Sequence, residues 1–349
     1  MSANTIQETG MENQQVELKQ DRKTRLRENI KQYYIYFVLA LVVVIFSVSR
    51  LDAVDFFGRG HFLSPNNLIN LVRIAVPVIT LSGAFTFLMV AEYIDLSVGS
   101  AMSLSAVVFA LMILNGFSFL PAFLITIVVG VVMGAINGLL VMQLQITPVI
   151  ATLVTLNLFK GIALLIVPNG VSAIKSTATQ TMPAWINNYA REKVLFGLPA
   201  AFFVAIVVII VLVIIQRKTI LGKYSAAIGG NRTASDLSGI NAVKTVWILY
   251  IIVGVCAAMA GMARASYMSL GDPLSGDGME LSCIIAVLLG GTRFAGGEGD
   301  VEKTIIGAII VICITVGMLT IIPAYWQQFT MGAVLIAAVV LNHLLVRND

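Results

Sequence analysis

Charged residues are scarce in this 349-residue sequence. Asp, Glu, Lys and Arg together make up 11% of it, less than half of the roughly 25% that is typical of a soluble domain. Hydrophobic residues make up 58%, and the mean hydropathy is +0.93. Most of the chain must therefore be surrounded by lipid or by its own helices. The net charge of +4 lies mainly in the loops, so nothing indicates a nucleic-acid partner.

Histidine and cysteine are too few for the common catalytic and metal sites. The two histidines, His61 and His343, are far apart in sequence, which argues against a paired metal site and a Ser-His-acid triad. Cys256, Cys283 and Cys313 lie in separate apolar runs, so neither a disulfide framework nor a thiolate metal site is predicted. We expect no catalytic residue, no metal site and no cofactor bound by this chain.

Long apolar runs dominate what is present. Runs of roughly 17 to 25 residues fit a bilayer core about 30 Å thick, whereas the short alternating strands of a barrel are absent. The sequence therefore predicts an all-α polytopic membrane protein, with a polar basic tail (1–32) followed by a transmembrane domain (33–346). About ten spans are expected, at approximately 33–49, 67–89, 96–114, 119–141, 147–167, 199–216, 244–266, 279–291, 303–321 and 325–346.

Loop charges predict how the spans are oriented. Residues 19–31 carry six basic residues and two acidic ones, which by the positive-inside rule holds the tail in the cytoplasm. Segment 217–243 is basic and falls on the same side, and the loop with Asp272 and Asp277 falls outside. The outer segment 168–198, with three basic residues and one acidic, has the opposite bias. An even number of spans then places both termini in the cytoplasm, with the first apolar run kept as a helix because no cleavable signal peptide is recognisable.

A weak internal repeat is visible across the spans. Ile94-Asp-Leu-Ser97 opens the third span and Met279-Glu-Leu-Ser282 opens the eighth, while Gly134-Ala-Ile136 and Gly307-Ala-Ile309 lie in the fourth and ninth. Both pairs are five spans apart, an odd offset, which predicts inverted repeats. Chance similarity between short apolar patterns is the alternative.

Polar residues within or beside the spans need an explanation, because a carboxylate in mid-span costs roughly 2.5 to 3.5 kcal/mol. Asp95 is placed to cap the third span, and Glu280 the eighth; a proton or cation relay is the alternative. The amides and hydroxyls of the fourth and fifth spans either bond between helices or line a wet path for a neutral hydroxylated solute. The candidate pathway residues are Glu92, Asp95, Ser97, Asn137, Thr152, Thr155 and Asn157.

Two glycine-rich features have ordinary structural interpretations. Gly130, Gly134 and Gly138 recur every four residues on one helix face, which permits close helix packing within the chain or at a dimer seam. The run 290–299, GGTRFAGGEG, resembles a phosphate-binding loop but follows an apolar helix, and no Gly-Lys-Ser/Thr occurs. We interpret it as a flexible cytoplasmic turn.

A half-polar segment, GKYSAAIGGNRTASDLSGIN (222–241), separates two apolar runs. Residues 224–228 can form a short helix, the two glycines at 229–230 break it, and residues 233–237 can form another. Two short helices rich in small residues predict a docking surface for a partner on the cytoplasmic side. An ordinary polar connector is the alternative.

This segment resembles the cytoplasmic coupling loop (about 217–243) of permease subunits of bacterial ABC importers for ribose, galactose, xylose and related compounds, within the branched-chain amino acid/sugar permease superfamily. Further matching motifs follow in order over roughly residues 35–345: IDLSVGS (94–100), NGL (137–139), TPVIATL (147–153), the glycines of 290–299, and YWQ (325–327).

The resemblance implies a fold like that of the vitamin B12 importer, with ten spans, inverted repeats and a place in the bacterial inner membrane. It implies a homodimer or a paired related permease, a cytoplasmic ATP-binding cassette ATPase that binds ATP and Mg²⁺, and a periplasmic or lipid-anchored solute-binding protein. By the same resemblance, the surface that meets the ATPase would comprise Gly222, Ala227, Gly229, Gly230, Asn231, Ala234 and Gly239.

One departure from the family pattern bears on the solute. The family usually has two glycines before Ile-Asp-Leu-Ser, where this chain has Glu92 and Tyr93. The function that the resemblance implies is import of a sugar or sugar-like neutral solute, and the departure leaves the precise cargo open. The alternative is an ion-coupled secondary transporter of a small polar solute.

Overall fold

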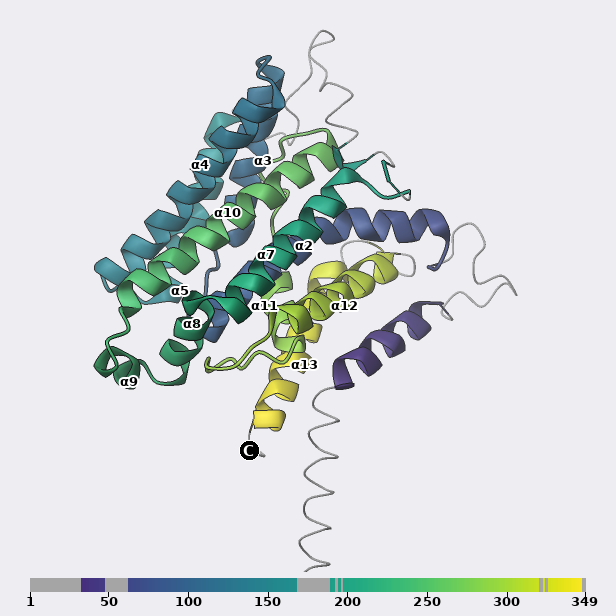
Figure 1. Cartoon of the computed structure of the whole chain (residues 1–349). Coiled ribbons are helices and arrows are strands. Elements are labelled where there is room, and N and C mark those ends of the chain that lie inside the picture. Colours follow the sequence, from purple (N-terminus) through teal and green to yellow (C-terminus); the bar gives the residue numbers. More distant parts are fainter. Residues whose placement is uncertain are drawn as a thin grey trace, which may run out of the picture.

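The computed structural model describes residues 33–47, 62–167, 189–191, 194–195, 197–319, 323 and 326–346, with the backbone alone for 341–346. Over these residues the regular secondary structure is helical, apart from a single bridge between Leu195 and Leu198, and loops connect the helices (Figure 1). The predicted tail (1–32), His61 and most of the predicted outer segment 168–198 lie outside the described residues.

Six helices of the described chain are long and apolar enough to cross a membrane. They are α2 (Pro65–Val90), α4 (Phe119–Gly138, continued by the π-helical turn Leu139–Gln143), α5 (Pro148–Ile166), α7 (Ala200–Lys218), α10 (Ala242–Met268) and α12 (Val301–Leu319). Shorter apolar helical stretches occupy the other predicted spans: Tyr33–Ser47, α3 (Val98–Leu114), α11 (Met279–Leu289) and the part Gln327–Val340 of α13 (Gln327–Val346). A polytopic helical membrane protein is confirmed, and the count of ten spans stays a prediction.

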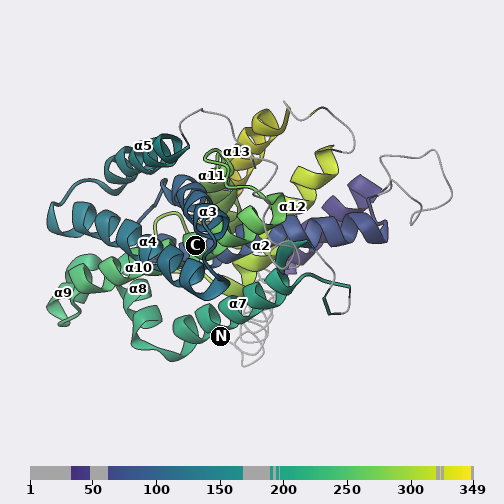
Figure 2. The same cartoon turned by 90° about the horizontal axis from the view of Figure 1, so that it is seen from above.

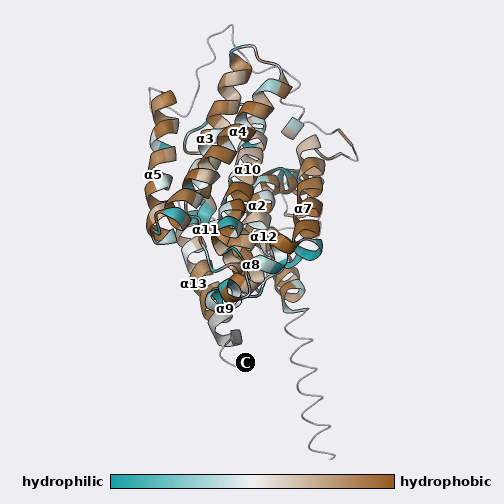
Figure 3. Cartoon of the chain, turned by 60° about the vertical axis from the view of Figure 1, so that its left-hand side comes forward, coloured by the Kyte–Doolittle hydropathy of each residue, from teal (hydrophilic) through white to brown (hydrophobic). Residues whose placement is uncertain are grey.

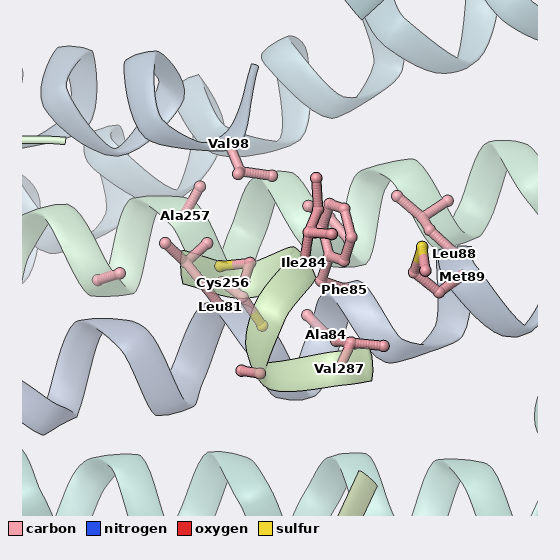
Figure 4. Close-up of a cluster of buried hydrophobic side chains, with 14 of the residues drawn as sticks. Leu81, Ala84, Phe85, Leu88, Met89, Val98, Cys256, Ala257, Ile284 and Val287 are labelled. Atoms are coloured by element: carbon pink, nitrogen blue, oxygen red, sulfur yellow. The ribbon is translucent and has the colours of Figure 1, made fainter. Parts of the chain in front are cut away.

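Two helices, α2 and α10, form the centre of the bundle and pack against each other (Figures 1 and 2). From Ala75 to Val90 every residue of α2 is buried, as expected for a helix that is apolar on all sides. Leu81 and Phe85 of α2 lie beside Ala257 of α10 and Ile284 of α11 (Figure 4).

The outer helices divide between these two. Helices α3 and α4 pack mainly on α10, whereas α11 and α12 pack mainly on α2 and on each other. Since α3 and α4 follow α2 in sequence while α11 and α12 follow α10, each half of the chain wraps the central helix of the other. Inverted repeats would account for such an exchange, and they stay a prediction.

Glycines allow α4 to approach α10 closely. A Cβ on Gly134 would lie 2.3 Å from the carbonyl oxygen of Tyr250, and a Cβ on Gly254 would lie 2.2 Å from that of Gly130. A Cβ on Gly138 would meet the ring of Trp247 at 2.1 Å. The predicted glycine stripe therefore packs within the chain, and the dimer seam considered for it is wrong for this face.

Two non-helical segments run into the bundle from opposite ends. Segment 91–97 follows the end of α2, and its Ile94 carbonyl accepts a bond of 3.1 Å from Tyr250, in the third turn of α10. Segment 269–278 follows the end of α10, and its Gly276 packs backbone to backbone against Gly99 of α3. Helices α3 and α11 therefore begin beside each other inside the bundle.

Candidate functional site

A buried polar cluster lies where segment 91–97 meets α4 and α5. Asp95 Oδ1 accepts from the Ser97 amide at 2.8 Å and from the Ser97 hydroxyl at 2.6 Å. The Asn137 amide of α4 donates to Asp95 Oδ2 at 3.1 Å and to Ser97 Oγ at 2.8 Å. Thr155 of α5 donates to Asn137 Oδ1 at 2.7 Å. All four side chains are at most 3% exposed, so these bonds join three elements in an apolar surrounding.

The capping role predicted for Asp95 needs a correction. The cap residue of α3 is Ser97, and the Asp95 carboxylate holds the backbone and hydroxyl of Ser97 instead of the first-turn amides. The capping residue of α11 is Gly278 and not Glu280, which follows two residues later in the first turn of the helix. A carboxylate there still faces the favourable end of the helix dipole.

The remaining pathway candidates are not part of the cluster. Thr152 is buried next to Thr155, but its hydroxyl bonds to the Pro148 carbonyl of its own helix. Asn157 is exposed and bonds to the Leu153 carbonyl. Glu92 is exposed and adopts a left-handed backbone with φ 67°. The structure therefore brings together four of the seven candidates, with Thr152 adjacent.

A cavity of about 580 Å³ lies on the other side of the start of α3, and sequence reasoning missed it. Its walls come from α2, α3, α5, α10, α11, α12, α13 and segment 269–278. Lys160 of α5 crosses one wall to Asp277, with its Nζ 2.7 Å and 2.9 Å from the two carboxylate oxygens. In the sequence, Lys160 stands as a single charged residue inside the apolar span 147–167, and this could have indicated the cavity.

The cluster and the cavity are linked through the first turn of α3. Ser100 lines the cavity, and its hydroxyl donates to the carbonyl oxygen of Ser97 at 2.9 Å. Glu280, also on the cavity wall, lies close to the same turn, because a Cβ on Gly99 would sit 2.6 Å from its Oε2. A displacement of the α3 start therefore affects both sites.

The half-polar segment forms two short helices, α8 (Ile220–Gly230) and α9 (Arg232–Leu237), as predicted. They begin at Thr219 and at Asn231, whose side chain caps α9 by accepting from the Ala234 amide at 2.9 Å. Gly239, at φ +81°, ends α9 in the left-handed conformation that suits glycine. Contrary to the expected break, Gly229 and Gly230 are the last residues of α8.

Not every residue predicted to face the ATPase is on the surface. Gly230, Asn231, Ala234 and Gly239 are exposed, and Ala227 is half-buried. Gly222 and Gly229 pack inward: a Cβ would lie 2.1 Å from the Gln216 carbonyl oxygen at Gly222 and 1.9 Å from that of Val90 at Gly229. These two glycines seat α8 on the bundle. Polar residues gather at this end of the otherwise apolar helices (Figure 3).

The glycine-rich run supports the same end of the bundle. The Gly297 amide donates to the Val90 carbonyl at 2.8 Å. Gly296 and Gly297 have positive φ values and pack against Glu92 and the Gly229–Gly230 backbone. The run is a turn, as predicted, but it is packed between the ends of α2 and α8.

Arg232 connects α9 to segment 91–97. Its Nη1 donates to the Tyr93 hydroxyl at 2.8 Å. Burial raises the pKa of the Tyr93 hydroxyl, and the Arg232 guanidinium opposes that rise. At neutral pH the phenol is therefore protonated, and its oxygen accepts the bond.

Comparison with known proteins shows where this architecture belongs. Residues 67–339 match the family described as the branched-chain amino acid transport system / permease component. The chain belongs to this permease family. The permease is 32% identical to the D-allose transport system permease protein of Escherichia coli, over 90% of this chain and 92% of that protein.

Two further relatives have similar coverage. The ribose import permease protein of Escherichia coli is 30% identical, over 88% of this permease and 92% of the relative. The xylose transport system permease protein of Haemophilus influenzae is 30% identical, over 89% and 96%. No solved structure matches the chain. The permease is thus a multi-pass transport subunit and not an enzyme.

Proposed function

We propose that the permease is the membrane subunit of an ATP-binding cassette importer, and that it carries a sugar or sugar-like neutral solute across the bacterial inner membrane. The named relatives are permeases for allose, ribose and xylose. A separate ATPase supplies the energy, with ATP and Mg²⁺ bound there. The permease functions as a homodimer or with a related permease, and a periplasmic or lipid-anchored binding protein delivers the solute.

The exposed α8–α9 surface, formed by Gly230, Asn231, Ala234 and Gly239, is the observation that carries this proposal. It projects from the bundle on two capped short helices, while inward glycines fix its base. Small residues on such a surface let a partner approach closely. We assign this end, and both termini, to the cytoplasm, in agreement with the basic charge of segment 217–243.

A contact route leads from that surface to the interior. Arg232 holds Tyr93, which is two residues before Asp95, and the buried cluster around Asp95 fixes Ser97 at the start of α3. Ser97 in turn accepts from Ser100 on the cavity wall. A movement of α9 imposed by the ATPase would therefore reach the cavity through segment 91–97.

The test is reconstitution of the permease with its ATPase and binding protein in vesicles, with sugar-stimulated ATP hydrolysis as the readout. Ala234→Glu places a charge on the α8–α9 surface and should abolish the stimulation while the chain remains folded and inserted. Asn115→Glu, on an exposed residue at the opposite end of α3, is the control and should hydrolyse normally.

Two outcomes would contradict the proposal. Wild-type rates of ATP hydrolysis in Ala234→Glu would show that the ATPase does not dock on the α8–α9 surface. Uptake that proceeds without the ATPase and stops when an ionophore is added would identify the ion-coupled secondary transporter instead.

A further inference from the structure

We propose that the cavity beside the α3 and α11 starts is a monosaccharide-binding site, in which Lys160, Asp277 and Glu280 bind the sugar hydroxyls. This inference rests on the proposed function and adds the site at which that function holds its solute. The volume of about 580 Å³ lies within the range of roughly 300 to 1,000 Å³ that is usual for small-molecule pockets.

The charges around the cavity suit a neutral solute. Lys160 and Arg264 contribute two positive charges to the lining, and Asp277 and Glu280 contribute two negative ones. A charged solute would be attracted by the two residues of opposite charge and repelled by the two residues of like charge. A sugar hydroxyl both donates and accepts, so one polyol can accept from the ammonium and donate to the carboxylates.

The ion pair of Lys160 and Asp277 can exchange partners at small cost. The two side chains are 31% and 47% exposed, and a pair this exposed contributes little to stability. The pair joins α5 to segment 269–278, so a sugar that binds both groups also bridges these two elements. The hydroxyl of Ser275, on the same wall, has no hydrogen-bond partner in the part of the chain that the structure describes.

The composition of the remaining wall predicts weak binding. Among the described residues, the lining contains no aromatic ring, and its apolar members are aliphatic side chains such as Val78, Leu156 and Met331. Sugar rings are therefore held by polar contacts without stacking. Millimolar affinity is appropriate for a site that a solute must leave during each transport cycle.

The experiment measures sugar binding to the purified permease in lipid nanodiscs by ligand-observed NMR, without ATPase or binding protein. The probes are D-allose, D-ribose, D-xylose and D-fructose as neutral sugars, with D-gluconate as an anionic sugar derivative and D-glucosamine as a cationic one. We expect saturable binding of at least one neutral sugar and tighter binding of it than of the two charged compounds.

Variants then assign the binding groups. Lys160→Met and Glu280→Gln should weaken binding at least tenfold, whereas Lys160→Arg, which keeps a positive charge and N–H donors, should retain most of it. Lys244→Met is the matched control, because Lys244 is exposed in the first turn of α10, away from the cavity wall. The melting temperature of Lys160→Met, compared with that of the wild type, shows whether its loss of binding is a folding defect.

The inference fails if no neutral sugar binds, or if Lys160→Met and Glu280→Gln both bind as the wild type does. Its failure is distinguishable from failure of the proposed function. If both variants bind sugar with wild-type affinity and uptake is driven by ATP, the proposed binding site is wrong and the proposed function stands. If sugar binding depends on Lys160 but uptake needs no ATPase, the binding site stands and the proposed importer function is wrong.

Discussion

Arg232 and Tyr93 are 139 residues apart in sequence, yet the guanidinium of one donates to the hydroxyl of the other at 2.8 Å. Arg232 is exposed at the start of α9, whereas Tyr93 is 7% exposed at the start of the segment that leads into the bundle. The bond therefore joins the proposed ATPase surface to the interior.

Tyr93→Phe removes that bond and keeps the ring. Hydrogen bonds to charged groups contribute about 1.5 to 3 kcal/mol, less when exposed, so we expect a loss of about 1 kcal/mol of coupling, or about fivefold in the sugar stimulation of ATP hydrolysis. Tyr224→Phe on α8 is the control, because the Tyr224 hydroxyl has no hydrogen-bond partner among the described residues. Stimulation at the wild-type level in Tyr93→Phe would show that the bond does not transmit movement.

Gly229→Ala tests how α8 is seated on the bundle. Its Cβ would lie 1.9 Å from the Val90 carbonyl oxygen, so α8 must shift, at a cost of about 1 to 3 kcal/mol. The neighbouring Gly230→Ala meets nothing within 4 Å and should be neutral or slightly stabilising. Thermal unfolding in detergent compares the two, and equal melting temperatures would contradict the inward packing of Gly229.

Asn137→Ala tests the buried cluster. It leaves the Thr155 hydroxyl without its acceptor and removes a donor from Asp95 and Ser97, which should cost about 1 to 3 kcal/mol of stability. Asn157→Ala removes a similar amide that is exposed on α5 and should change stability by less than about 0.5 kcal/mol. The melting temperatures of the two variants are compared to test this difference. A melting temperature of Asn137→Ala equal to that of the wild type would mean that water replaces the amide.

Glu92→Gly tests the departure from the family pattern. Glu92 holds φ 67°, a conformation that costs a residue with a Cβ about 1 to 2 kcal/mol but suits glycine, apart from a loss of about 0.5 to 1 kcal/mol in chain entropy. We expect a net gain of up to about 1 kcal/mol. Lys223→Gly, at an exposed position within α8, should instead lose about 1 kcal/mol. A lower melting temperature in Glu92→Gly would show that the carboxylate stabilises this turn.

The helices could be predicted from the sequence. Apolar length located the long ones, and residues 233–237 before Gly239 predicted the short helix that is observed as α9 (Arg232–Leu237). These features depend on local chemistry. The close packing of the Gly130–Gly134 stripe also follows from spacing along a single helix.

The direction in which a residue faces could not be predicted in the same way. Two adjacent glycines have no side chains that differ in polarity, so nothing local distinguishes inward Gly229 from outward Gly230. The ion pair of Lys160 and Asp277 joins residues 117 positions apart, and the cavity exists only where several helices meet. Spacing along the chain contains no information on such contacts.

The meeting of Gly99 and Gly276 limits which residues these two positions can hold. Each glycine lies so near the other that a Cβ would come within 2.3 Å and 2.0 Å of the opposite carbonyl oxygen. The Ser103 hydroxyl fastens the same contact, because it accepts from the Gly276 amide at 2.8 Å. Any residue larger than glycine at either position would therefore push α3 and segment 269–278 apart.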